Sequence, residues 1–333
     1  MGSKTVLVTD YVWPSVEPEM KVLAKYGVDL LVAPDSNENT LIEMVKEVDG
    51  ILTCFAKVTK KVVEAAENCK VIGRYGVGVD NIDVVEATNQ GIIVTYVPDY
   101  CVDEVADHVM GLLLSWNRRI ILHNEDTKSN GWGNAGLNMR IMRLKEKNLG
   151  IIGFGRIGKS VAQKAKAFGL NILAFDPVVD KNSMDKLGVT KTNLEQLLSE
   201  SHFISLHSPL IEQTANMISY DQFNQMRKDA LLINCARGGL INEDALYEAL
   251  ESNKIAGAGL DVLVDINPGL NHRLIQHPKI IITPHTAFFS QEAVLELEQR
   301  AAQYVGQVLN GEKPNNIINS EVLNNNLLRS KLN

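Results

Sequence analysis

The chain has 333 residues, with 33 Lys and Arg against 40 Asp and Glu, which gives a net charge of −7 at pH 7. This length exceeds what a single hydrophobic core usually supports, so two domains are expected. The acidic balance gives no electrostatic reason to bind nucleic acid or an anionic membrane, and 45% hydrophobic residues are typical of a soluble globular protein. Composition therefore favours small-molecule chemistry.

The cysteines and the N-terminus exclude further classes. The four cysteines form no CxxC pair and have no metal-ligand spacing, so we expect neither a disulfide framework nor a metal site. The start MGSKTVLVTD lacks the charged and apolar regions of a signal peptide, and no apolar run approaches the roughly 18 residues of a membrane span. A cytoplasmic location is expected.

Apolar, β-branched runs alternate with helical patterns along the chain. The first hundred residues contain KTVLV, VDLLVA, GILTC, VIGRY and IIVT, and a second series contains LGIIG, NILAF, FISL, ALLIN, IAGAG and IIIT. This alternation is typical of parallel sheets connected by helices. The sequence predicts an α/β fold with two doubly wound parallel-sheet domains.

Two longer helical patterns separate these series, at about residues 102–122 and 290–309. The first is apolar around most of its faces, which predicts burial between domains or between subunits. Because the dinucleotide motif lies between the two helices, we expect a cofactor domain over 102–285 and a second domain built from 1–101 plus 286–333. The Asn-rich tail after the second helix is expected to be a loosely held surface strap.

A glycine-rich motif directly follows the apolar strand LGIIG. Gly153, Gly155 and Gly158 have the GxGxxG spacing that permits a tight turn, close approach to a pyrophosphate and close packing of the following helix. Asp176 ends the next strand, 18 residues after Gly158, where a carboxylate binds ribose hydroxyls and repels a 2′-phosphate. The pattern favours NAD over NADP; a flavin or S-adenosylmethionine site is the alternative from this motif alone.

Polar residues follow other strands, where ligands bind in parallel sheets. Arg237 follows a buried strand and could hold a carboxylate bidentately, with a structural ion pair as its alternative. His285 follows the strand IIIT, and its ordinary pKa of about 6.5 suits proton transfer to or from a hydroxyl. Val77 and Gly78, in RYGVGVD, could offer backbone N–H groups to a carboxylate or could form a simple turn.

The other histidines compete less well for the role of acid or base. His108 lies inside the long apolar helix, where we expect a packing residue. His207 ends the strand FISL and is expected near the cofactor.

With these segments the chain resembles the D-isomer-specific 2-hydroxyacid dehydrogenases, the family of D-3-phosphoglycerate dehydrogenase, D-lactate dehydrogenase and the C-terminal binding proteins. The similarity runs from KTVLVTD to the final helix and depends on RYGVGVDNIDV, YCVDEVADHVMGLLL, LGIIGFGRIG, LINCARGGLINEDAL, GAGLDV and TPHTAF. It implies a Rossmann NAD-binding domain inserted in a flavodoxin-like substrate domain, and a homodimer formed through the NAD-binding domain.

The resemblance also implies roles for individual residues. Arg237 and the backbone of Val77 and Gly78 would hold the carboxylate of a small 2-keto or 2-hydroxy acid, and His285 would be the acid/base. Residues implied to contact NAD are Gly153, Gly155, Arg156, Ile157, Gly158, Asp176, His207, Cys235, Ala236, Arg237, Asp261 and His285. The expected activity is hydride transfer between the nicotinamide and C2 of the acid, and the alternative is an NAD(H)-binding regulator similar to the C-terminal binding proteins.

One segment departs from the family pattern. Family members have a Glu-Pro after GLDV, and that glutamate binds the catalytic histidine. Here the stretch is GLDVLVDINP, so the glutamate position falls on Ile266 counted from Asp261, or on Asn267 counted back from Pro268. Asp265 is the nearest acid.

Three hypotheses remain open for this segment: Asp265 or Asn267 replaces the glutamate, the reaction uses another proton donor, or the chain is a weakly catalytic regulator. Formate dehydrogenases of the superfamily resemble it in using an amide beside the histidine, but their substrate-binding asparagine would align with Cys101, so formate is not the expected substrate.

Overall fold

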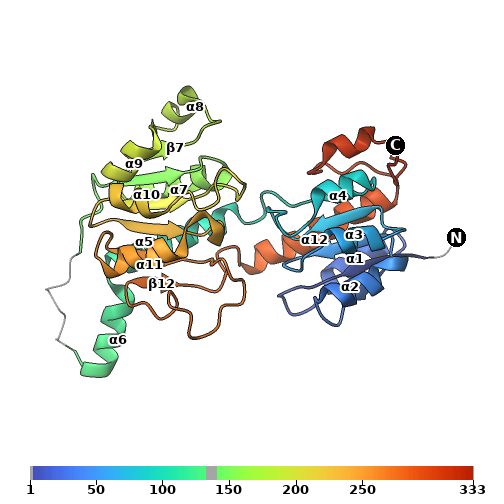
Figure 1. Ribbon diagram of the computed structural model, residues 1–333, viewed down its shortest axis with the longest axis horizontal. Coiled ribbons are helices and arrows are strands. Elements are labelled where there is room, and N and C mark those ends of the chain that lie inside the picture. Colours follow the sequence, from blue (N-terminus) through green and yellow to red (C-terminus); the bar gives the residue numbers. More distant parts are fainter. Residues whose placement is uncertain (1–2, 133–140, 333) are drawn as a thin grey trace. The chain divides into compact units, whose positions relative to one another are not determined.

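The computed structural model describes residues 3–132 and 141–332, and the chain divides into two compact units (Figure 1). Unit 1 comprises Met1–Tyr100 and Ser290–Asn333, and unit 2 comprises Cys101–Phe289.

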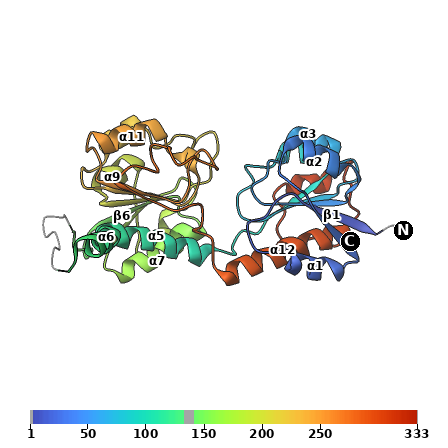
Figure 2. The same cartoon turned by 90° about the horizontal axis from the view of Figure 1, so that it is seen from below.

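Unit 1 contains a five-stranded parallel sheet in the order β2-β1-β3-β4-β5. The strands are β1 (Lys4–Val8), β2 (Val28–Val32), β3 (Gly50–Thr53), β4 (Val71–Arg74) and β5 (Ile93–Thr95). Helices α1 (Glu17–Ala24) and α12 (Gln291–Leu309) cover one face, and α2 (Glu38–Met44) and α3 (Lys60–Ala65) cover the other (Figure 2). Short segments η1 (Val45–Glu47), α4 (Val84–Asn89) and η3 (Ser320–Asn324) complete the unit.

Unit 2 contains a seven-stranded parallel sheet in the order β12-β11-β10-β9-β6-β7-β8. The strands are β6 (Asn148–Ile152), β7 (Asn171–Phe175), β8 (Thr190–Lys191), β9 (Phe203–Leu206), β10 (Leu231–Asn234), β11 (Gly257–Leu260) and β12 (Ile280–Ile282). The order reverses between β6 and β9, as it does in dinucleotide-binding sheets, where the cofactor lies at the reversal.

Helices cover both faces of this second sheet, with α5 and α7 on one face and α9 and α11 on the other (Figure 2). The helical segments are α5 (Val102–Asn117), α6 (Ile120–Asn130), α7 (Arg156–Ala167), α8 (Lys181–Asp185), α9 (Leu194–Glu200), α10 (Tyr220–Gln225), η2 (Gly238–Leu240) and α11 (Glu243–Glu251). The predicted α/β class with two parallel-sheet domains is therefore confirmed.

The predicted helix over 102–122 is interrupted. It ends after Asn117, and Arg119 adopts a left-handed backbone with φ 55° that a right-handed helix cannot continue. The Arg119 guanidinium lies 4.1 Å from the centre of the Trp116 ring, which holds it against the end of α5. Within the single chain, α5 buries eight of its residues and α6 buries none, so the expected burial is found for α5, and burial of α6 against another subunit stays a prediction.

The Asn-rich tail is held firmly, contrary to the sequence-based expectation. Asn319 is 1% exposed; its side chain accepts a hydrogen bond from the Val94 N–H at 2.8 Å and donates to the Ile92 carbonyl at 2.9 Å. Arg329 donates to the carbonyl groups of Ala66 and Cys69 at 2.6 and 3.1 Å. Side chains that look solvating in the sequence here satisfy buried backbone groups at the edge of the sheet.

Unit 1 also buries a pair of carboxyl groups. Glu19 is 0% exposed and accepts hydrogen bonds from the Tyr75 hydroxyl at 2.9 Å and the Trp13 indole N–H at 3.3 Å. Glu298 of α12 is 4% exposed, and burial together with the charge of neighbouring Glu19 raises the pKa of Glu298 to about 8. The pair therefore holds a proton at neutral pH.

Candidate functional site

The glycine motif forms the turn between β6 and α7. Gly153 has φ +92°, and a Cβ there would lie 2.7 Å from the backbone of His207. A Cβ on Gly158 would lie 2.3 Å from the carbonyl oxygen of Gly153, so the third glycine permits the helix to pack on the strand. A Cβ on Gly155 would meet nothing within 4 Å, which leaves open space at the start of α7. This arrangement fits a pyrophosphate at the helix N-terminus.

Asp176 directly follows β7 and reaches this turn. Its Oδ2 accepts a hydrogen bond from the Phe154 N–H at 2.8 Å, and its Oδ1 accepts bonds from Val178 and Val179 at 2.8 and 2.9 Å. Burial acts to raise the pKa of Asp176, but these N–H groups outweigh it and lower the pKa below its usual value. An ionised carboxylate therefore lies beside the glycine turn, where the sequence predicts a ribose.

The strand ends beside this turn carry uncharged groups. Burial lowers the pKa of His207 to about 4, and its Nε2 lies 2.9 Å from the Ser205 hydroxyl, so His207 is neutral at physiological pH. Burial and the charge of Asp261 raise the pKa of Cys235 well above its usual range, so Cys235 is a thiol and not a thiolate. Neither residue is set up as an acid, base or nucleophile.

Arg237 lies in the loop that follows β10. Asn234, 1% exposed, ends the strand; it accepts a hydrogen bond from the Ala236 N–H at 3.0 Å and donates to the Arg237 carbonyl at 2.8 Å. These bonds fix the loop that carries the arginine. Asn234 was missed from the sequence, although a polar residue at the end of the apolar strand LLIN is a visible signal.

Glycine also couples this loop to the next one. A Cβ on Gly238 would lie 2.1 Å from the carbonyl carbon of Leu263 and 2.4 Å from the Val264 nitrogen. The loop that carries Arg237 and the loop after β11 therefore pack backbone against backbone, and any side chain at Gly238 would push them apart.

His285 lies on a strained turn after β12. Its φ is +54°, which is uncommon for a residue with a side chain, and its N–H donates to the Asp261 carbonyl at 2.8 Å. The Asp261 carboxylate, 1% exposed, accepts hydrogen bonds from the N–H groups of Thr286 and Ala287 at 2.9 Å each. Asp261 thus binds three consecutive N–H groups of the turn, beginning with that of His285, and holds the backbone that carries the imidazole.

The loop after β11 carries Asp265 and Asn267, and both side chains are exposed. The Asp265 carboxylate accepts a hydrogen bond from the Asn267 N–H at 2.9 Å, which closes a local turn. At the start of the loop, Glu243 accepts a hydrogen bond from the Val264 N–H at 2.7 Å. The Glu243 carboxylate is an anchor that the sequence analysis did not find.

Val77 and Gly78 lie in unit 1, after β4. Gly76 has φ +137° and donates to the Arg74 carbonyl at 3.0 Å, which turns the chain at the end of the strand. Within residues 3–132 and 141–332, the N–H groups of Val77 and Gly78 donate no hydrogen bond, and Val77 is 40% exposed. Two backbone donors are therefore available to an acceptor at this turn.

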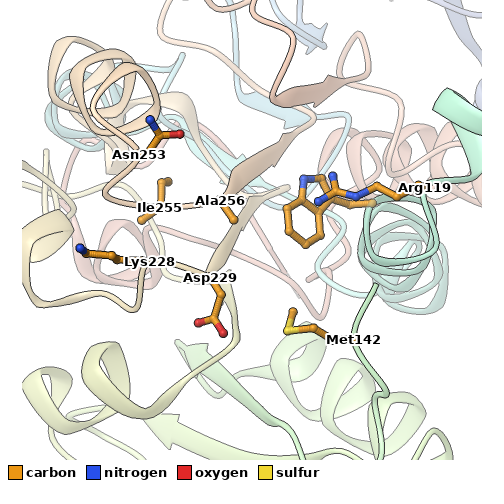
Figure 3. Close-up of a pocket in the computed structure, with 8 residues that line it drawn as sticks. Arg119, Met142, Lys228, Asp229, Asn253, Ile255 and Ala256 are labelled. Atoms are coloured by element: carbon orange, nitrogen blue, oxygen red, sulfur yellow. The ribbon is translucent and has the colours of Figure 1, made fainter. Parts of the chain in front are cut away.

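A separate cavity lies near the amino ends of strands β10 and β11, whereas the candidate site lies at the carboxyl ends of the strands (Figure 3). It has a volume of about 260 Å³ and is lined by Trp116 and Arg119 near the end of α5, by Met142, and by residues that precede β10 and β11. The glycine turn, Arg237 and His285 instead follow the carboxyl ends of their strands. The cavity is therefore distinct from the candidate site.

Among residues 3–132 and 141–332, no helix is long and apolar enough to cross a membrane. In the same part, no group of three or more His, Cys, Asp and Glu side chains could hold a metal ion.

The chain belongs to the D-isomer specific 2-hydroxyacid dehydrogenase family. Residues 110–287 match the family model described as "D-isomer specific 2-hydroxyacid dehydrogenase, NAD binding domain". This match covers the glycine turn, Asp176, Arg237 and His285. The family and the NAD cofactor drawn from the sequence motifs are thereby confirmed, and unit 2 contains the NAD-binding domain.

Relatives carry several names within this family. The chain is 40% identical to D-3-phosphoglycerate dehydrogenase of Methanocaldococcus jannaschii over 94% of its own length, but it spans only 59% of that relative. It is 36% identical to glyoxylate reductase of Thermococcus litoralis over 92% of its own length and 95% of that protein. A structure of D-lactate dehydrogenase from Aquifex aeolicus with NAD and lactic acid has a TM-score of 0.84, 27% identity, and coverage of 92% of this chain and 96% of that chain.

Proposed function

We propose that the protein is an NAD-dependent D-2-hydroxyacid dehydrogenase that reduces a small 2-keto acid. The observation that carries this proposal is the turn of His285, where the buried Asp261 carboxylate and carbonyl hold a histidine in a strained conformation at a strand end. Strain of this kind persists where surrounding bonds maintain it, often at functional sites. Family membership supplies the class of reaction.

The residues of unit 2 fit a bound NAD. Gly153, Gly155 and Gly158, with Arg156 and Ile157 at the start of α7, would hold the pyrophosphate, and Asp176 would bind the ribose. His207, Cys235, Ala236 and Asp261 would contact the rest of the cofactor, as the family resemblance implies. When bound, the nicotinamide supplies the hydride that reduces the substrate carbonyl.

The substrate carboxylate would bind Arg237 and the free N–H groups of Val77 and Gly78. A guanidinium presents two parallel N–H donors that match the two carboxylate oxygens, and Asn234 fixes the loop from which it extends. This binding holds the 2-keto carbon in one orientation, which contributes to the rate through proximity.

His285 would donate a proton to the carbonyl oxygen as it becomes a hydroxyl. General acid catalysis by a positioned side chain contributes about 10²- to 10⁴-fold to the rate. We propose that Asp265 or Asn267 replaces the family glutamate as the partner of the imidazole. Both residues lie in one turn of the loop after β11, in which the Asp265 carboxylate accepts the backbone N–H of Asn267.

We further propose that the active form is a homodimer formed through unit 2. Helix α6 buries none of its residues, and it exposes three consecutive apolar side chains, Ile120, Ile121 and Leu122, at 53%, 40% and 42%. Exposed apolar clusters of this kind mark interaction surfaces. Sedimentation of the wild type and of Ile121→Glu tests the idea, since the variant should lower the mass to that of a monomer.

The experiment that tests the activity is oxidation of NADH by the purified chain with a panel of 2-keto acids, from glyoxylate and pyruvate to larger and phosphorylated acids, between pH 5 and 9. We expect turnover with at least one acid and loss of nearly all of that turnover, about 10²-fold or more, in His285→Ala. An absence of turnover across the panel, with NADH binding intact, would overturn the dehydrogenase proposal and favour an NAD(H)-binding regulator.

A further inference from the structure

Helix α5 lies directly on strand β11 because two glycines of the strand remove the side chains between them. A Cβ on Gly257 would lie 2.3 Å from the Trp116 indole nitrogen, and a Cβ on Gly259 would lie 3.3 Å from the Leu112 Cβ. Leu112 and Trp116 are four residues apart, so they share one face of the helix. The two glycines are two residues apart, so they share one face of the strand. Trp116 therefore lies over Gly257 and Leu112 lies over Gly259, with the helix close to the strand.

The next position in this register joins His108 to Asp261. His108 is one turn before Leu112 on the same helix face, and Asp261 is two residues after Gly259. The His108 Nε2 lies 3.7 Å from the Asp261 Oδ1. The close packing permitted by the glycines thus brings the imidazole to the buried carboxylate.

Thr283 bridges the two side chains and fixes the direction of the hydrogen bonds. Its hydroxyl donates to the Asp261 Oδ1 at 2.6 Å, and its Oγ1 lies 2.9 Å from the His108 Nε2. A hydroxyl has one proton, and the Thr283 hydroxyl uses it in the hydrogen bond to the carboxylate. The His108 Nε2 must therefore be the donor in its hydrogen bond with Thr283. The result is a directed chain from His108 through Thr283 to Asp261.

This chain ends on the turn that carries His285. The same Oδ1 of Asp261 that binds Thr283 also accepts the Thr286 N–H at 2.9 Å, and the Oδ2 accepts the Ala287 N–H. A rotation of the carboxylate would break its bonds to the N–H groups of Thr286 and Ala287, the two residues that directly follow the left-handed His285. His108 and Thr283 oppose that rotation from the side of the carboxylate that faces α5.

We propose that His108 is a positioning residue for the reaction: acting through Thr283 and Asp261, it holds the imidazole of His285 in the orientation needed for proton transfer. The proposal rests on the acid/base role proposed for His285. It also assigns a task to a residue that the sequence alone predicts to be a packing residue.

Two matched pairs of variants test this chain. Thr283→Val and His108→Leu remove the hydrogen bonds, whereas Thr283→Ser and His108→Gln keep a hydroxyl and an Nε2 donor. We expect the first pair to lower kcat by about 10- to 100-fold, the range seen when groups that orient a metal-binding histidine are removed. The KM for NADH should stay within about 3-fold, and the second pair should recover most of kcat.

A spectroscopic measurement separates this inference from the proposed activity. In protein labelled with ¹⁵N-histidine and bound to NADH, the ring resonances of His285, identified by their absence in His285→Ala, should shift in His108→Leu and return toward wild type in His108→Gln. If the wild type reduces no 2-keto acid but these resonances shift, the dehydrogenase proposal fails and the positioning chain stands.

Two results would overturn the inference: unchanged His285 resonances in both His108→Leu and Thr283→Val, or an equal fall of kcat in Thr283→Ser and Thr283→Val. Should His108→Leu fail to fold, the Thr283 pair decides, because valine has nearly the shape of threonine and lacks only the hydroxyl.

Discussion

The N–H of His285 donates a hydrogen bond to the carbonyl of Asp261 at 2.8 Å, so the histidine after β12 is held by the residue that follows β11. Since β11 and β12 are parallel neighbours, their carboxyl ends meet at one edge of the sheet. The strand pairing therefore fixes the position of the expected acid/base before any ligand binds.

Replacement of the two central side chains should separate binding from chemistry. His285→Ala should lower kcat by about 10²-fold or more, because a positioned general acid is lost. Arg237→Ala should raise the KM for the 2-keto acid, and Arg237→Lys should recover only part of it, because lysine cannot bind a carboxylate bidentately. Steady-state kinetics with both substrates varied checks this; a KM unchanged in Arg237→Ala would contradict the assignment of the carboxylate site.

Asp176 should decide the preference between the two nicotinamide cofactors. Its ionised carboxylate repels a 2′-phosphate, so the wild type should use NADH far better than NADPH. Asp176→Ser should weaken NADH binding and narrow the difference in affinity between NADH and NADPH. Fluorescence titration with each cofactor measures both affinities. Because the carboxylate also binds the Phe154 N–H, the melting temperature of the variant serves as the control for folding. If Asp176→Ser lost as much affinity for NADPH as for NADH, the role of Asp176 would be structural.

The pH profile should identify the partner of His285. A carboxylate beside an imidazole favours its protonated form, so it extends activity in the direction of reduction to higher pH, by about 1 to 3 units for a close pair. If Asn267 is the partner, Asn267→Glu should move the alkaline limb of kcat upward, and Asn267→Gln should not. If Asp265 is the partner, Asp265→Asn should move that limb downward. A limb that moves in none of these variants excludes both residues.

The contact between α5 and β11 should be sensitive to added volume. Gly257→Ala places a Cβ 2.3 Å from the Trp116 indole and 2.9 Å from the Lys279 carbonyl oxygen, so we expect a loss of about 1–3 kcal/mol in the free energy of unfolding. The control is Gly111→Ala in helix α5, where a Cβ meets nothing within 4 Å. It should stabilise the protein by about 0.5–1 kcal/mol. Denaturant unfolding compares the two, and equal effects would contradict the close packing.

The buried carboxyl pair should make stability depend on pH. Burial and the charge of Glu19 raise the pKa of Glu298 from 4.5 to about 8 in the folded protein. Between these values the folded protein keeps a proton that the unfolded chain releases, so the free energy of unfolding falls as the pH rises through this window. The glutamine of Glu298→Gln does not titrate and binds no proton on folding. The melting temperature of this variant should therefore fall less between pH 5 and 8 than that of the wild type. Identical pH dependence in the two proteins would contradict the raised pKa.

The elements that the sequence identified are those with strong local signals. The β-branched runs become the strands of two parallel sheets, and the spacing of Gly153, Gly155 and Gly158 becomes the turn between β6 and α7. The break at Arg119 could not be predicted, because it depends on the guanidinium stacking on Trp116 and not on a proline or glycine. The tail was misjudged for a similar reason: Asn319 looks solvating in the sequence, but its partners Ile92 and Val94 lie more than two hundred residues away.

The sequence by itself determined the α/β class, the family and the NAD-binding motif, because strand periodicity, glycine spacing and the acid after the second strand are local features of the chain. Only the tertiary structure decided how His285 is held. The bonds from Asp261, Thr283 and His108 join residues up to 175 positions apart, and their partners are set by parallel strand pairing and by the close approach of α5 over Gly257 and Gly259. Contacts of this kind depend on which strand ends become neighbours, and no local pattern encodes that.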